Sequence, residues 1–304
     1  MTTPLKSGVW GVLATPFSGS AHDVCEPSLE REVKLFADAG VAGLTVLGVF
    51  GEASSLTASE QQDVVDTVCA IKGDLPVVIG VPGRATHTVI EQIDNITAVA
   101  RDLAGVMVQV NTADPVALHR HLSGVHGAVG VPLVVQDYPL VSGVRINQGD
   151  LARVVADLGD AVSGVKSEAP PTPSAIATLT KVVDVPVFGG LGGVGLLDEL
   201  AAGSAGAMTG FSFPEALVAT VRAFATEGLD RAREIYAPWL PLVNFEAQAG
   251  ISLAVRKELL RARGLFIESD VRAPAASFPD NLSPLVDAHL KAAEAQLRDL
   301  IAVP

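Results

Sequence analysis

The feature of this chain that most constrains its fold is a regular alternation of two kinds of segment. Short apolar runs rich in β-branched residues recur along residues 8–211, and stretches with helical periodicity lie between them. The runs are apolar throughout and do not alternate with polar residues, which predicts parallel strands covered on both faces. Eight such runs are present, at residues 8–14, 43–48, 76–81, 105–110, 132–137, 162–167, 186–190 and 206–211.

Eight β units with helices between them favour a closed barrel, because doubly wound sheets usually have about five to seven strands. The length of 304 residues suits one such barrel with an appendage. After residue 212 only helical periodicity continues. We therefore expect an α/β fold, with a (β/α)8 TIM barrel at residues 1–224 and a C-terminal helical extension at 225–304 that packs on the barrel.

Two of the expected helices have clear end signals. In the helix expected at 28–40, Ser28 is a candidate N-cap and Gly40 a candidate terminator. In the helix that follows Thr57, the spacing of Thr57 and Glu60 predicts a capping box.

Charge and composition narrow the possible partners. A formal net charge of −13 disfavours nucleic acid and anionic membranes as partners, since both require basic patches. Glycine, proline or charge interrupts every apolar run before the ~20 residues that span a bilayer. The N-terminal segment lacks the basic region and cleavage site of a secretory signal, so we expect a cytoplasmic protein.

Two patterns that suggest ligand sites are not interpreted as such. His119 and His121 are spaced i,i+2, which does not place two metal ligands on one helical face. We expect them, together with His126, on a solvated helix surface, and we expect no metal site. The glycine-rich segment 188–195 lacks the lysine and the serine or threonine of a phosphate loop, and we expect it to be the turn after the seventh strand.

One lysine stands out by its position. Of the seven lysines only Lys166 lies inside a strand-like apolar run, at its carboxyl end, where the active sites of barrels are found. Burying an ammonium there is costly unless the group is paired or deprotonated, and a deprotonated lysine is the nucleophile of Schiff-base chemistry. Two interpretations stay open from position alone: a catalytic lysine, or a lysine paired structurally with Glu168.

Two further segments are expected at the same end of the barrel. Tyr138 ends the fifth strand, next to the strand of Lys166, so its phenol is either a proton relay or a buried tyrosine satisfied by backbone groups. In the turn 47–57, Gly48 and Gly51 allow backbone amides to approach a carboxylate closely, and Glu52 is expected to brace that turn.

These segments together resemble the dihydrodipicolinate synthase/N-acetylneuraminate lyase family of class I aldolase-type barrels, over essentially the whole chain. The matching motifs occur in family order and at family spacing. They are ATPF (14–17), LGVFGE (47–52), Tyr138 after the fifth strand, GVK (164–166) and GSAGAMTG (203–210).

The resemblance implies a mechanism for this chain. Lys166 would condense with the ketone of pyruvate or a related 2-oxo acid, and Tyr138 would relay protons. Backbone amides around Phe50 and Gly51 would hold the substrate carboxylate, and Met208 would present its backbone carbonyl to the substrate. Neither a metal nor an organic cofactor is implied, the partner is a small-molecule 2-oxo acid, and a homotetramer or homodimer is expected.

Departures from the family pattern bear on the substrate. Val49 and Phe50 stand where members that make dihydrodipicolinate carry two threonines. The tyrosine that such members donate across an interface has no match in the segment 111–115, and the arginine expected after Tyr138 is missing. We count Val49 and Phe50 among the substrate-binding residues and expect a different acid in the pocket.

Glu168 lies in KSEAPPTP (166–173), where the family usually has a different sequence. It serves either as the general base of a dehydration or as a brace for its loop. The sequence thus predicts a Schiff-base-forming lyase, an aldolase or a dehydratase. The alternatives are dihydrodipicolinate synthase proper, or a catalytically silent barrel that binds 2-oxo acids.

Overall fold

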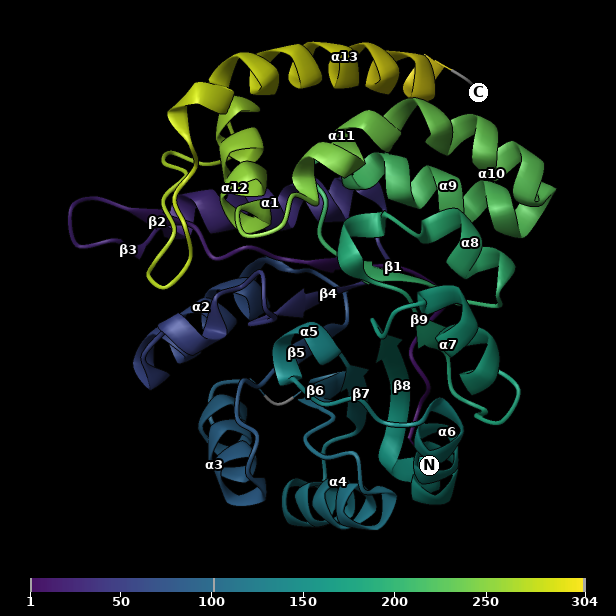
Figure 1. Ribbon diagram of the computed structural model, residues 1–304. Coiled ribbons are helices and arrows are strands. Elements are labelled where there is room, and N and C mark those ends of the chain that lie inside the picture. The colour runs from purple at the N-terminus through teal and green to yellow at the C-terminus, as the bar shows by residue number, and fades with distance from the viewer. Residues whose placement is uncertain (1, 101, 303–304) are drawn as a thin grey trace.

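The computed structural model describes residues 2–100 and 102–302. Eight parallel strands form one sheet in the order β10-β1-β4-β5-β6-β7-β8-β9, and backbone hydrogen bonds between β9 and β10 complete the ring (Figure 1). The predicted (β/α)8 barrel is therefore confirmed, and each strand lies within one of the eight predicted runs. The strands are β1 (Gly8–Val12), β4 (Gly43–Val46), β5 (Val77–Gly80), β6 (Gly105–Gln109), β7 (Leu133–Asp137), β8 (Val162–Ser167), β9 (Val187–Phe188) and β10 (Gly206–Thr209).

Helices cover the outside of the barrel, and their apolar faces pack on the strands. They are α1 (Glu26–Ala39), α2 (Ala58–Ile71), α3 (Thr86–Thr97), α4 (Pro115–Val129), α6 (Gln148–Leu158), α7 (Thr172–Leu179), α8 (Leu196–Ala201) and α9 (Pro214–Glu227), with the short α5 (Pro139–Ser142) after β7. A hairpin of β2 (Phe17–Ser18) and β3 (Asp23–Val24) lies between β1 and α1, a feature that the sequence pattern did not predict.

Four further helices form the C-terminal appendage: α10 (Leu229–Tyr236), α11 (Leu240–Glu246), α12 (Ser252–Ala262) and α13 (Ser283–Ala302). Figure 1 shows them gathered on one side of the barrel, where α13 packs across α11 and α12. Since α9 continues to Glu227, we place the proposed junction between barrel and appendage at Gly228. Within residues 2–100 and 102–302 no helix is long and apolar enough to cross a membrane.

The helix-end signals are confirmed in two cases and wrong in one. Thr57 and Glu60 form the predicted capping box, and Gly40 ends α1 with the left-handed φ of 80° that glycine tolerates. Ser28 is not the N-cap of α1, because the helix begins two residues earlier, at Glu26. Its hydroxyl instead accepts a hydrogen bond from the backbone amide of Ile267.

The expected solvated surface for the histidines of α4 is wrong for His121. This side chain is buried, and its Nδ1 lies 2.9 Å from Thr86 Oγ1 at the start of α3. Burial lowers the pKa of His121, so the ring is neutral and packs between neighbouring helices.

The interior of the barrel changes character along the strands. On the amino-terminal side of the strands the interior is filled by a buried apolar cluster, which includes Trp10, Met107, Val134, Phe188 and Met208. Inward-facing residues recur at every second position of a strand. The next inward layer, toward the carboxyl ends, therefore contains the polar or small residues Gly80, Gln109, Gln136, Lys166, Gly190 and Gly210. The sequence thus leaves space and polar groups at this end of the barrel.

Gly206 is required where β10 meets β1, and this requirement generates a prediction. Its φ is +143°, and a Cβ there would lie 1.9 Å from the carbonyl oxygen of Gly8. We expect Gly206→Ala to lower the free energy of unfolding by about 2 kcal/mol or more, because the backbone of β1 must move.

Gly127→Ala, at an exposed position of α4 with no atom near the added methyl group, is the matched control. It should raise stability by about 0.5–1 kcal/mol. Urea unfolding of both variants measures the difference, and equal stability of the two would show that the β1–β10 contact is not as close as described.

Candidate active site

A buried ion pair lies at the carboxyl end of β8. Lys166 Nζ is 3.3 Å from Glu168 Oε2, and the two side chains are only 7% and 4% exposed. The two side chains project to the same side because they are two positions apart, with Glu168 just beyond the strand end. The two interpretations of Lys166 are therefore compatible: the lysine is paired with Glu168, and the pair lies where barrel enzymes carry out their chemistry.

Glu168 is fixed by one neighbour on β7 and by another in the turn after β9. Gln136 Nε2 on β7 donates a hydrogen bond of 2.8 Å to Oε2, and the backbone amide of Leu191 donates one of 3.3 Å to Oε1. Gly190 gives the carboxylate its space, because a Cβ at that position would lie 2.4 Å from Oε1. The glycine-rich turn after β9 therefore serves to hold Glu168 beside Lys166.

A small cavity opens at this pair and brings together most of the predicted site. Lys166, Tyr138, Glu168, Val49 and Phe50 all line it. The complete lining is Val12, Val49, Phe50, Tyr138, Lys166, Glu168, Leu191, Thr209 and Gly210. Two residues predicted to bind substrate, Gly51 and Met208, are not in that lining. The side chain of Met208 is buried in the apolar cluster below, one residue before Thr209.

Tyr138 lines the cavity but is not the direct cross-strand neighbour of Lys166. In the β7–β8 register Gln136 lies opposite Lys166, and Tyr138 follows the end of β7. Burial, with a smaller contribution from the nearby Glu168 carboxylate, raises the pKa of Tyr138 to about 12. The phenol therefore keeps its proton at neutral pH and is a hydrogen-bond donor at the cavity wall.

The turn after β4 contains backbone amides that could bind a carboxylate, but the expected amide of Gly51 is not one of them. The amide of Gly51 donates to the carbonyl of Gly48 at 2.9 Å, and that of Glu52 donates to the carbonyl of Val49 at 3.1 Å. Among the described residues, the amides of Val49 and Phe50 have no such acceptor. Two successive amides next to the cavity can hold an anion, as in other backbone nests.

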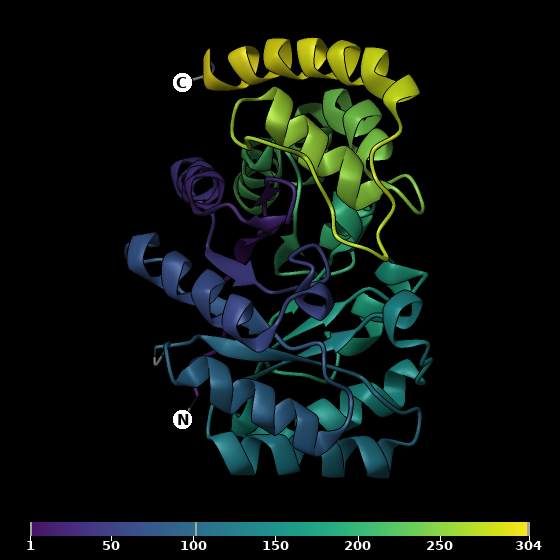
Figure 2. The same cartoon turned by 90° about the vertical axis from the view of Figure 1, so that its left-hand side faces the viewer.

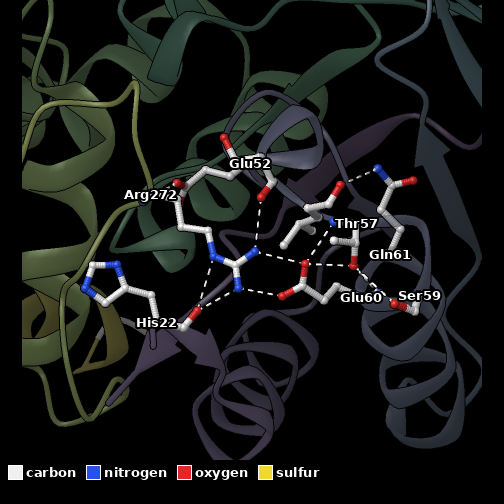
Figure 3. A network of polar contacts seen from close by, with 9 residues as sticks. His22, Glu52, Thr57, Ser59, Glu60, Gln61 and Arg272 are labelled. Carbon is white, nitrogen blue, oxygen red and sulfur yellow. Dashed lines mark hydrogen bonds and ion pairs between the residues drawn. The ribbon is translucent and has the colours of Figure 1, made fainter. Parts of the chain in front are cut away.

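Glu52 fastens this turn to the appendage (Figure 3). Its Oε1 is hydrogen-bonded to Lys257 Nζ on α12, and its Oε2 accepts a hydrogen bond of 2.9 Å from the backbone amide of Arg272. The Arg272 guanidinium in turn bonds to Glu60 and to the carbonyl of His22. The segment between α12 and α13, which Figure 2 shows running from the appendage back to the barrel, is thereby held against the turn.

Arg256 of α12 lies directly behind the cavity wall. Its guanidinium is buried, donates to the carbonyl of Val12 at 2.5 Å and stacks 4.9 Å from the centre of the Phe50 ring. A Cβ at Gly210 would overlap its Nη1. Glu32 Oε1 lies 3.7 Å from Arg256 Nη2, and burial raises the pKa of Glu32 to about 7 although the charge of Arg256 opposes this change. The appendage thus supports three residues of the cavity lining without entering the cavity.

The sequence interpretation missed Gln136, Gln109 and Arg256. The two glutamines interrupt apolar runs near their carboxyl ends, as Lys166 does, and counting every second position from the apolar interior would have identified them. Arg256 lies in an ordinary helical pattern, and only the tertiary structure brings it to the cavity.

Fold and site together define a (β/α)8-barrel protein with a lysine–glutamate pair at its mouth. A family model for the Dihydrodipicolinate synthetase family matches residues 5–293. The L-2-keto-3-deoxyarabonate dehydratase of Azospirillum brasilense is 28% identical over 94% of this chain and 97% of that protein. The 4-hydroxy-tetrahydrodipicolinate synthase of Methanopyrus kandleri is 26% identical over 77% of this chain and 79% of that protein.

The solved structure of a dihydrodipicolinate synthase from Rhodopseudomonas palustris is similar, with a TM-score of 0.87 and 29% identity. The aligned region covers 95% of this chain and 98% of the Rhodopseudomonas palustris chain. The chain therefore belongs to the dihydrodipicolinate synthetase family, and it is a lyase.

The anchoring of the turn generates a prediction about Glu52. Glu52→Gln removes the charge that compensates Lys257, whose side chain is fully buried. We expect a loss of about 3–5 kcal/mol in the free energy of unfolding, because an uncompensated buried charge remains.

Asp38→Asn is the matched control, since it breaks the exposed Lys34–Asp38 pair. It should cost no more than about 0.5 kcal/mol. Thermal and urea unfolding compare the two variants, and a cost at Glu52 as small as that at Asp38 would contradict the proposed anchor.

Proposed function

We propose that the protein forms a Schiff base between Lys166 and the ketone of a small 2-oxo acid, and that it eliminates water from the bound acid. The observation that carries the proposal is the 3.3 Å contact between Lys166 Nζ and Glu168 Oε2, two buried side chains that line the same small cavity. An amine attacks a ketone only after it loses a proton, and the paired carboxylate is in place to receive that proton.

The proposed reaction begins with the addition of the Lys166 amine to C2 of the acid. Glu168 returns the proton that it took from Lys166 to the hydroxyl of the carbinolamine, which leaves as water. The product is the protonated imine, which withdraws electrons from C3, and Glu168 is again a carboxylate. Glu168 then removes a proton from C3, and the resulting enamine expels the hydroxyl of C4 as water when a general acid protonates it. Tyr138, whose phenol keeps its proton at neutral pH, is our candidate for that acid.

The substrate carboxylate is proposed to bind at the amides of Val49 and Phe50. These amides have no protein acceptor within the described ranges and lie next to the cavity. The roles expected of Gly51 and Met208 stay predictions. The Gly51 amide already donates a hydrogen bond to the carbonyl of Gly48, and Met208 directly precedes Thr209, which lines the cavity. Neither a metal nor an organic cofactor is part of the proposed reaction.

Dehydration is favoured over aldol chemistry by two observations. The dehydratase of Azospirillum brasilense is similar to this chain over nearly the full length of both proteins. Glu168 also supplies a fixed carboxylate 3.3 Å from the amine that would carry the imine, which suits the removal of a proton from C3. Dihydrodipicolinate synthase activity is the second candidate, because several relatives are such synthases, but Val49 and Phe50 replace the threonines associated with it.

We retain two further expectations as parts of this proposal. The protein is proposed to assemble as a homodimer or homotetramer and to act in the cytoplasm.

Borohydride trapping tests the Schiff base. After incubation with pyruvate and borohydride, mass spectrometry of the wild type should find the adduct on Lys166. Lys166→Ala should form no adduct and lose at least about 10³-fold in turnover, because the nucleophile is gone. Lys181→Ala, which removes an exposed lysine, is the control and should behave as the wild type.

The outcomes separate the alternatives. No adduct on any lysine would contradict the proposal and support a silent barrel. An adduct with activity only in a coupled assay of pyruvate and aspartate semialdehyde would instead identify the synthase.

A further inference from the structure

Three polar side chains lie at one level across three adjacent strands. Gln109 on β6 pairs with Gln136 on β7, and Gln136 pairs with Lys166 on β8. In parallel strands, paired positions on the inward face point into the barrel together. The Schiff-base lysine is thus the end of a short row of polar groups, and the dehydration described above uses only part of it.

Gln109 is the member of this row without a partner. Its side chain is 8% exposed, and its amide makes no hydrogen bond with any described residue. Its Oε1 is fully buried. Buried amides are almost always hydrogen-bonded, because an unmet one costs about 1–3 kcal/mol. Exchanging the oxygen and nitrogen of the amide does not change this conclusion. A ligand group that enters the cavity lined by Gln109 can supply this partner.

Gln109 and Gln136 also line a second cavity, which we call the side cavity. It lies over the carboxyl ends of β4 to β7 and includes Gly80, where a Cβ would lie 2.6 Å from the carbonyl oxygen of Leu47 and displace the turn after β4. Val49 belongs to the linings of both cavities, and Gln136 is bonded to Glu168 of the first. A substrate attached to Lys166 can therefore extend from the reaction cavity into the side cavity.

We propose that the amides of Gln109 and Gln136 bind a hydroxyl group on C5 of the substrate, the carbon that follows C4, from which the hydroxyl leaves as water. This inference rests on the proposed function and names its substrate class: a 2-oxo acid of at least about five carbons with a hydroxylated far end. Adjacent strands are about 4.8 Å apart, so the backbone of Gln136 lies one strand and that of Gln109 two strands, about 10 Å, from Lys166. Three substrate carbons beyond the ketone carbon and the length of a glutamine side chain together span this distance.

The chemistry of the side cavity favours a hydroxyl over a charged group. An amide both donates and accepts hydrogen bonds, as a hydroxyl does, whereas a carboxylate only accepts them. Among the described residues that line the side cavity, only Arg84 is charged, and it is exposed. The buried part of this cavity therefore fits a neutral, polar substrate end.

The test compares two substrates in two proteins. One substrate is 2-oxo-4,5-dihydroxypentanoate, and the other is 2-oxo-4-hydroxypentanoate, which lacks the far hydroxyl but keeps the one that leaves. The wild type should prefer the first substrate in kcat/KM by about 10- to 100-fold, because the acid without the far hydroxyl leaves the amide of Gln109 unpaired. Gln109→Met, of similar length and without a hydrogen-bonding amide, should reduce this preference to about threefold or less.

Each outcome decides the inference. A structural role of Gln109 would change both substrates equally and leave the preference unchanged, which would overturn it. If Gln109→Met does not fold, the preference of the wild type alone decides, and the absence of any preference overturns the inference. Borohydride trapping of pyruvate on the wild type is run in parallel. Failure of that trapping removes the proposed function, whereas trapping without substrate preference removes only the present inference.

Discussion

The structure depends on a lysine and a carboxylate held together out of water. Removing two charges from water costs several kcal/mol per ion, and such a pair often stabilises a protein no better than apolar residues would. The surrounding residues nevertheless keep Lys166 and Glu168 in contact: Gln136 and the amide of Leu191 bind the carboxylate, and Gly190 makes room for it. This cost fits the proposed chemistry, in which the pair moves a proton so that the amine can attack a ketone.

The C-terminal appendage belongs to the site although none of its residues lines the reaction cavity. Lys257 holds Glu52 and thereby the turn whose residues Val49 and Phe50 line the cavity, and Arg256 supports Phe50 and Gly210 from behind. Both cations are buried, and burial lowers the pKa of each while neighbouring carboxylates oppose that change. The barrel supplies the groups that we propose to react, and the appendage fixes the loops around them.

The sequence predicted the fold well because the fold follows from a repeated local pattern. All eight strands and the capping box at Thr57 are readable from neighbouring residues alone. The same local reasoning brought Lys166, Glu168 and Tyr138 to one end of the barrel. It failed for His121, whose burial depends on another helix, and it missed Gln109, whose importance depends on which strand lies beside it. Register and helix contacts are tertiary properties, and no single segment encodes them.

The most direct test of this account is a crystal structure of the protein reduced with borohydride in the presence of a hydroxylated 2-oxo acid. We predict continuous density from Lys166 Nζ to C2 of the acid, with the carboxylate of the acid at the amides of Val49 and Phe50 and its far hydroxyl beside Gln109. Density for the acid on a different lysine, or unattached outside the two cavities, would contradict the account.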